Sequence, residues 1–284
     1  MICPMERTVL AKGFGFVEGP RWHDDLLYFA DMGSKEVYAV DQVGRVREVC
    51  VVEARPSGIG WLPDGRMLVV SMMDRRVLRM EPNGSLVEHA DLSELASAPC
   101  NDMVVDGRGN AYVGNPGYDL RNPPSPLPGA EVVLVRADGS AEVVDDQVRF
   151  PNGSAVTPDN RTLIVAETFG HALAAWDIAE DGTLSNRRTF ADLDGRSPDG
   201  IALDAEGGVW FADARGDACL RVLEGGEITD VVETGRGCFA CALGGDDRRT
   251  LFLLTGEHFG AETMKKRVGA IETVRVTVPG AGWP

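Results

Sequence analysis

The sequence predicts an all-β fold, a six-bladed β-propeller whose four-stranded blades surround a central channel. Three observations lead to this prediction. Short runs rich in Val, Leu, Ile, Phe and Tyr, separated by turns of Gly, Asp, Asn and Pro, fill the 284 residues almost from end to end. The runs are not interrupted by a long amphipathic helical pattern. A hairpin-like segment also recurs six times, at a spacing typical of one propeller blade.

The recurring segment begins with residues at equivalent positions, spaced 39 to 51 residues apart: Glu18, Ser57, Asn101, Asn152, Asp199 and Phe239. Its hairpin turns, for example at 63–65 and 204–207, supply the Asp and Gly residues that such turns need. One unit cannot bury its apolar faces alone, so the units are expected to pack around an axis. We therefore expect residues 1–284 to form one domain.

The two ends of the chain both contain strand-like segments, at 7–10 and 270–278. We expect these segments to share the last blade and thereby close the ring.

Composition excludes several partners. The net charge is −16 and the pI about 4.7, so the protein field repels nucleic acids and anionic membranes and favours a cation. The sequence lacks the patterns of a secretory signal and of a membrane span, which predicts a cytoplasmic protein. The six cysteines are scattered, and the pair Cys238 and Cys241 lacks further zinc ligands, so we expect reduced, buried thiols.

The starts of the units carry a pattern that strand propensity does not explain. In a propeller the first strand of each blade lies innermost, so these starts should meet at one mouth of the channel. Asn and Asp are disfavoured at buried strand ends unless they have partners. Together these side chains, Glu18, Asn101, Asn152 and Asp199, would form an oxygen cage suited to a hard divalent cation. The alternative, simple Asx turns, does not explain Glu18.

Four motifs carry a family resemblance: E-G-P at 18–20, N-D-M-V-V-D at 101–106, F-P-N-G at 150–153 and S-P-D-G-I-A at 197–202. They resemble the family of regucalcin (senescence marker protein), gluconolactonases and luciferin-regenerating enzymes, over about residues 14–256. The resemblance implies a six-bladed propeller with one catalytic divalent metal ion, calcium ahead of zinc, manganese or magnesium. It also implies that Glu18, Asn152 and Asp199 are metal ligands and that Asn101 is a ligand or a near neighbour.

The chemistry that the resemblance implies is hydrolysis of a small lactone or of another cyclic or activated ester. A divalent ion would polarise the carbonyl and acidify a bound water, and a carboxylate would take the proton. The resemblance assigns this base to Asp199, with Asp102 as the alternative. Members that hydrolyse sugar lactones often carry an arginine where this chain has Pro99, which places aldonolactone specificity in doubt. A phosphoesterase-type propeller hydrolase and a non-enzymatic calcium-binding propeller remain open.

The loops that follow the second strand of each unit should return to the metal mouth and supply the substrate rim. Besides Asn101 and Asp102, the candidate substrate-binding residues are Met72, Tyr118, Phe169, His171, Arg215 and His258. The proline-rich stretch at 122–129 is either a semi-rigid cover of the mouth or an ordinary surface insertion.

Other enzyme classes fit poorly. The chain has four histidines, and the blade phase places His23 at the opposite mouth, so a histidine-rich binuclear site is not expected. A G-x-S-x-G nucleophile motif is absent from the sequence, and the glycines at 13–19 are not followed by a helical pattern.

Overall fold

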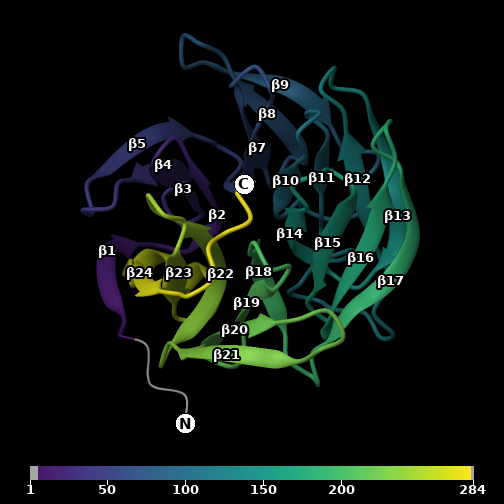
Figure 1. Cartoon of the computed structure of the whole chain (residues 1–284). Helices are drawn as coiled ribbons and strands as arrows, with labels where there is room; N and C mark the ends of the chain where they lie inside the picture. The colour runs from purple at the N-terminus through teal and green to yellow at the C-terminus, as the bar shows by residue number, and fades with distance from the viewer. Residues whose placement is uncertain (1–5, 283–284) are drawn as a thin grey trace.

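The computed structural model describes residues 6–282. Its strands form six four-stranded antiparallel sheets, arranged as blades around one axis (Figure 1). Within the first five blades the strands follow the chain from the axis outward. The predicted six-bladed β-propeller is thus confirmed.

The first three blades have these strands: β2 (Val17–His23), β3 (Leu26–Asp31), β4 (Glu36–Val40) and β5 (Val46–Val51); β6 (Pro56–Trp61), β7 (Met67–Ser71), β8 (Arg76–Met80) and β9 (Leu86–Asp91); β10 (Met103–Val105), β11 (Ala111–Val113), β12 (Ala130–Val135) and β13 (Ala141–Val148). The last three have these strands: β14 (Pro151–Val156), β15 (Thr162–Glu167), β16 (Ala172–Ile178) and β17 (Leu184–Asp192); β18 (Pro198–Leu203), β19 (Val209–Asp213), β20 (Ala218–Val222) and β21 (Ile228–Glu233); β22 (Gly237–Gly244), β23 (Thr250–Gly256), β24 (Gly269–Arg275) and β1 (Thr8–Phe14).

The sixth blade joins the two ends of the chain, as predicted. Its strand order is β22, β23, β24 and then β1, which pairs antiparallel with β24 through partners such as Thr8 and Thr273. This shared sheet closes the ring by hydrogen bonds between the first and the last strand.

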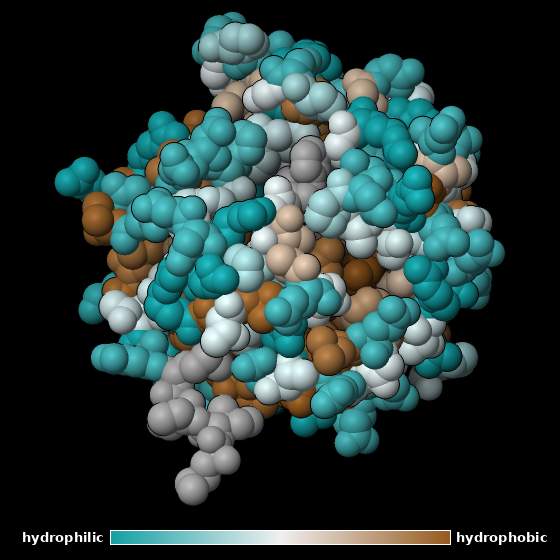
Figure 2. Space-filling view, viewed as in Figure 1, coloured by the Kyte–Doolittle hydropathy of each residue, from teal (hydrophilic) through white to brown (hydrophobic). Residues whose placement is uncertain are grey.

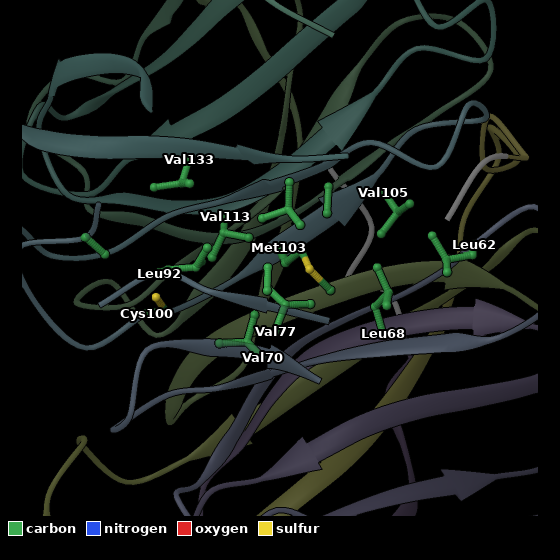
Figure 3. Close-up of a cluster of buried hydrophobic side chains, with 14 residues drawn as sticks. Leu62, Leu68, Val70, Val77, Leu92, Cys100, Met103, Val105, Val113 and Val133 are labelled. Carbon is green, nitrogen blue, oxygen red and sulfur yellow. The ribbon is translucent and has the colours of Figure 1, made fainter. Parts of the chain in front are cut away.

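The core lies between neighbouring blades, because both faces of each inner strand are covered. In the cluster between the second and third blades, Leu68 and Val70 of β7 pack with Met103 of β10 and Val113 of β11 (Figure 3). These side chains are 0–1% exposed. Burying each one contributes about 1.5–3 kcal/mol, which explains why the strands are nearly continuous hydrophobic runs.

Every inner strand except β10 has a bulge near its start, beside the residue that faces the mouth. In β6, Pro56 pairs with Ser71, but pairing resumes only at Ile59, so Ser57 and Gly58 oppose one residue. The same shift occurs in β2, β14, β18 and β22. In β6, β14, β18 and β22 the residue directly after the last pair before the bulge is therefore equivalent. These residues are Ser57, Asn152, Asp199 and Phe239.

The register also supports the alignment of the sixth unit. Pro198 pairs with Asp213 just before the bulge of β18, as Cys238 pairs with Thr255 just before the bulge of β22. Packing agrees, because Cys241 contacts the fifth blade as Ile201 contacts the fourth. Phe239 is therefore equivalent to Asp199, as the sequence alignment predicted.

A glycine follows the equivalent residue in four blades because neighbouring inner strands approach closely there. A Cβ added to Gly58 would lie 2.2 Å from the Met103 amide nitrogen. One added to Gly153 would lie 2.5 Å from the Asp199 carbonyl oxygen. In the third and sixth blades this position holds Asp102 and Ala240 instead.

Connections and thiols complete the fold. Residues 114–129 between β11 and β12 contain neither helix nor strand, as expected for the proline-rich loop. The short helix α1 (Ala261–Lys266) lies between β23 and β24, and within residues 6–282 we find no helix long and apolar enough to cross a membrane. Cys50, Cys100, Cys219, Cys238 and Cys241 are free and buried, and Cys3 lies outside the described residues. Burial raises the pKa of the Cys50 and Cys100 thiols to about 12.

Candidate metal and substrate site

The polar starts of the inner strands meet at one mouth of the channel. The Asn101 amide donates to Oδ1 of Asn152 at 2.9 Å, and the Ser57 hydroxyl lies 3.4 Å from Oδ1 of Asn101. The Asn152 amide donates in turn to the Thr168 hydroxyl at 3.2 Å. These contacts link the second, third and fourth blades, which are distant in sequence.

Two carboxylates, on the first and fifth blades, belong to the same cluster. Glu18 is 7% exposed and Asp199 is 9% exposed. Burial raises the pKa of Glu18 well above its usual range, and the charges of Asp199 and Asp102 raise it further. The pKa of Asp199 is raised in the same way by burial and then by Asp102, while the Asn152 amide partly offsets the shift. The carboxylates are thus close enough to repel one another.

Asp102 has a cationic partner that sequence reasoning missed. Nη2 of Arg21 lies 3.3 Å from both carboxylate oxygens of Asp102, and the two residues are 4% and 5% exposed. Arg21 also donates to the carbonyl oxygens of Pro20 and Met103. In sequence, the available signal was an arginine at a strand position that holds Gly60 and Ala202 in other blades.

The donor set fits a hard divalent cation. Glu18 and Asp199 offer carboxylate oxygens, and Asn101 and Asn152 offer amide oxygens, which are ligands that calcium prefers. Among residues 6–282 we find no group of three or more His, Cys, Asp and Glu side chains arranged to hold a metal ion. The candidate set contains only two such residues and is completed by amides. One guanidinium faces three buried carboxylates, which leaves negative charge that a cation would balance.

Three of the predicted rim residues lie together beside the mouth. The Tyr118 and Phe169 rings are 6.5 Å apart, and the Arg215 guanidinium lies 5.7 Å from the centre of the Phe169 ring. Their loops follow β11, β15 and β19. The three residues form a mixed aromatic and cationic wall over the third to fifth blades.

The other three predicted rim residues are engaged elsewhere. Met72 packs in an apolar cluster rather than in the wall of Tyr118, Phe169 and Arg215. The His171 Nδ1–H donates to the carbonyl oxygen of Arg196 at 2.8 Å. His258 is exposed, and its Nε2 lies 3.4 Å from the Thr263 hydroxyl.

The cluster around Met72 forms an apolar layer at this mouth, most of which sequence reasoning missed. The layer comes from the mouth-side loops and strand ends of the first, second, fifth and sixth blades and from α1: Phe16, Met32, Met72, Ala214, Phe239 and Met264. The Phe16 and Phe239 rings are 4.7 Å apart. No periodic pattern reveals such a layer, because its members come from separate loops.

A cavity of about 560 Å³ lies at the opposite mouth, among the hairpin turns. His23 lines it and stacks on Trp61 at 4.0 Å, which places His23 away from the carboxylates as expected. The chain end approaches the ring centre there, where Ala281 donates to the Leu203 carbonyl oxygen (Figure 1). Figure 2 shows hydrophobic residues toward the middle of this face. The carboxylate mouth is therefore the candidate functional site, because acids with perturbed pKa values mark functional sites better than cavity volume does.

Comparisons with known proteins agree with this geometry. Residues 16–257 match the model of the SMP-30/Gluconolactonase/LRE-like region. The chain is 27% identical to a 6-deoxy-6-sulfogluconolactonase of Pseudomonas putida, over 94% of this chain and 93% of that protein. It is 25% identical to a pentonolactonase of Haloferax volcanii, over 84% and 80%.

Among solved structures, the calcium-binding protein regucalcin of Agrobacterium tumefaciens superposes with a TM-score of 0.83 at 20% identity, covering 100% of this chain and 98% of that one. At this identity the superposition supports the fold alone. The family model, in contrast, spans most of the sequence and includes every candidate ligand. The chain therefore belongs to the SMP-30/gluconolactonase/LRE-like family.

Proposed function

We propose that this protein is a divalent-metal-dependent hydrolase of a small lactone or of another cyclic or activated ester. One observation carries the proposal. The carboxylates of Glu18 and Asp199 are both buried and interact electrostatically, and they cluster with the side-chain amides of Asn101 and Asn152. The names of two relatives, both lactonases, support the substrate class.

Glu18, Asn101, Asn152 and Asp199 would hold the ion, with calcium favoured because every donor is an oxygen. When bound, such an ion polarises an ester carbonyl and lowers the pKa of a coordinated water. The name of the calcium-binding structural relative supports this choice of metal.

Asp199 is the favoured general base. Its burial and its like-charged neighbours increase its affinity for a proton, which a base must accept from the attacking water. Asp102, the rival base, is already paired with Arg21. In the proposed reaction the water oxygen attacks the carbonyl carbon, the ring C–O bond breaks, and a hydroxy acid is released.

Asn101 and Asp102 would contact the substrate at the channel. Around them we assign the wall of Tyr118, Phe169 and Arg215 to substrate orientation. Met72, His171 and His258 stay candidates at the periphery of the site.

The proposal is tested by hydrolysis of γ- and δ-lactones, followed with a pH indicator. Chelator-treated protein should be inactive, and calcium, zinc, manganese or magnesium should be added back separately. Asp199→Ala should abolish turnover and weaken ion binding while the β-rich circular dichroism spectrum is retained. The matched control is Asp64→Ala, which removes an exposed carboxylate from a hairpin turn at the opposite mouth.

Two outcomes would contradict the proposal. Full activity of Asp199→Ala would overturn the mechanism. If no ion restores turnover of any lactone while the stripped protein still binds calcium tightly, the phosphoesterase and calcium-binding alternatives gain support.

A further inference from the structure

The apolar layer at the metal mouth has a composition that a polyhydroxylated substrate would not require. Phe16, Met32, Met72, Phe239 and Met264 are 3–9% exposed and pack on one another. They cover the first, second and sixth blades beside Glu18, which lies two residues after Phe16. A substrate that reaches Glu18 from this side therefore meets carbon and sulfur atoms.

Phe239 has a special place in this layer. It is equivalent to Asp199, at a position where the other five inner strands begin with an oxygen-bearing side chain. In the third blade this residue is Asn101, and the carboxylate of Asp102 follows it. The third and sixth blades lie opposite each other across a six-bladed ring, as β10 and β22 do in Figure 1. The site is thus flanked by a carboxylate on one side and by an aromatic ring on the other.

Three members of the layer, Met32, Met72 and Met264, are methionines. Methionine is flexible and polarisable, so it can rearrange around an apolar guest without a fixed cavity. Met264 lies on α1, within a connection between β23 and β24 and not in the sheet itself. The layer is accordingly suited to open for an apolar group and to close over it.

Two polar side chains of the predicted rim already have partners. Arg215 lies over the Phe169 ring, and His171 donates to the backbone of Arg196. Pro99, two residues before Asn101, offers no hydrogen-bond donor.

We propose that this site takes lactones that carry an apolar alkyl or aryl substituent, and that Phe239 and the methionines bind the substituent. This inference rests on the proposed function, since it names the substrate class of the same site. It departs from the sugar lactones named for two relatives.

A chain-length series provides the test. kcat/KM is measured with calcium for γ-lactones bearing unbranched alkyl groups from methyl to hexyl, and for gluconolactone. Each methylene buried in the layer should raise kcat/KM about fourfold until the layer is filled. Gluconolactone should be a poorer substrate than the longer alkyl lactones.

Variants locate the effect. Phe239→Ala should flatten the chain-length dependence and lower kcat/KM for the hexyl lactone about tenfold or more, while the methyl lactone changes less than threefold. Met73→Ala is the matched control, because Met73 adjoins Met72 but is 53% exposed. If Phe239→Ala fails to fold, Phe239→Leu and Met72→Gln should still reduce the slope.

The outcomes separate this inference from the proposed function. Turnover of lactones with no gain from chain length, or with preference for gluconolactone, overturns the inference and leaves the lactonase proposal intact. If no lactone is hydrolysed, the proposed function fails, and the inference is decided by calorimetric binding of the matching alkyl lactams. Affinity that rises with chain length in the wild type but not in Phe239→Ala supports the apolar site, and a flat series overturns it.

Discussion

Replacing Arg21 by methionine tests the charge balance of the site. Methionine keeps an unbranched apolar chain but removes the guanidinium that faces Asp102. Both residues are nearly fully buried, so the Asp102 carboxylate would be left without its cation beside Glu18 and Asp199. We expect the metal-free protein to lose much of its stability.

The magnitude follows from the contacts of Arg21. Removing one partner of a buried ion pair costs about 3–5 kcal/mol, because the remaining charge is uncompensated. The carbonyl oxygens of Pro20 and Met103 also lose a donor, which adds about 1 kcal/mol or more. The double variant Arg21→Met/Asp102→Asn removes both charges and should recover about 2 kcal/mol of this loss.

Urea unfolding at pH 7.5 gives the free energies, first with chelator and then with saturating calcium. Calcium should reduce the loss caused by Arg21→Met, because the ion adds positive charge to the same cluster. By thermodynamic linkage, Arg21→Met should also bind calcium more tightly than the wild type. The ratio of the two dissociation constants should correspond to the part of the stability loss that calcium restores. A loss below about 1 kcal/mol with chelator, or strictly additive effects of the two substitutions, would refute the assignment of a buried, coupled pair.

Three more outcomes are expected. The pKa values of Glu18 and Asp199 are raised in the folded protein, so folding is favoured when these two groups are protonated. This contribution to stability is complete below about pH 4 and is lost as pH rises through the raised pKa values. Metal-free protein should therefore have a lower urea midpoint at pH 8 than at pH 5. Asp199→Asn should weaken this pH dependence and raise the midpoint of metal-free protein at pH 7.5, and an unchanged profile would contradict the repulsion. The same variant should lose the rise in melting temperature that calcium gives the wild type, as a thermal scan would detect. Gly153→Ala should cost about 3 kcal/mol or more in urea unfolding, because its Cβ would strike backbone atoms of the next blade, whereas Gly256→Ala, with its nearest contact at 3.8 Å, should cost less than about 1 kcal/mol.

The fold and the candidate ligands were predictable from the sequence because both follow from one repeated register. The residue at the start of each repeated unit lies at the same mouth. A pattern of oxygen-bearing residues at the blade period therefore becomes a cluster in space. Ring closure was predictable for a related reason, since an unpaired strand at each end of the chain needs a partner.

Other parts of the site depend on information that the repeat does not carry. The partner of Arg21 lies 81 residues away on the third blade, and no local pattern links the two. Helix α1 has only six residues and no side-chain cap at its N-terminus, so neither hydrophobic periodicity nor a capping motif predicts it from the sequence.

The glycines at the bulges explain how the same ring can have a polar half and an apolar half at its mouth. Where an inner strand touches the backbone of the next blade, as at Gly58 and Gly153, any side chain would collide. Packing therefore requires glycine at those two positions, whatever the chemistry of the site. The third blade has Asp102 at this position, and the sixth has Ala240. The sixth blade differs one residue earlier, where Phe239 replaces an oxygen-bearing side chain, and it lies opposite the third blade. A carboxylate with its own arginine on one side and an aromatic ring with methionines on the other thus give the mouth a polar and an apolar half, while the sheets that support both halves keep the same register.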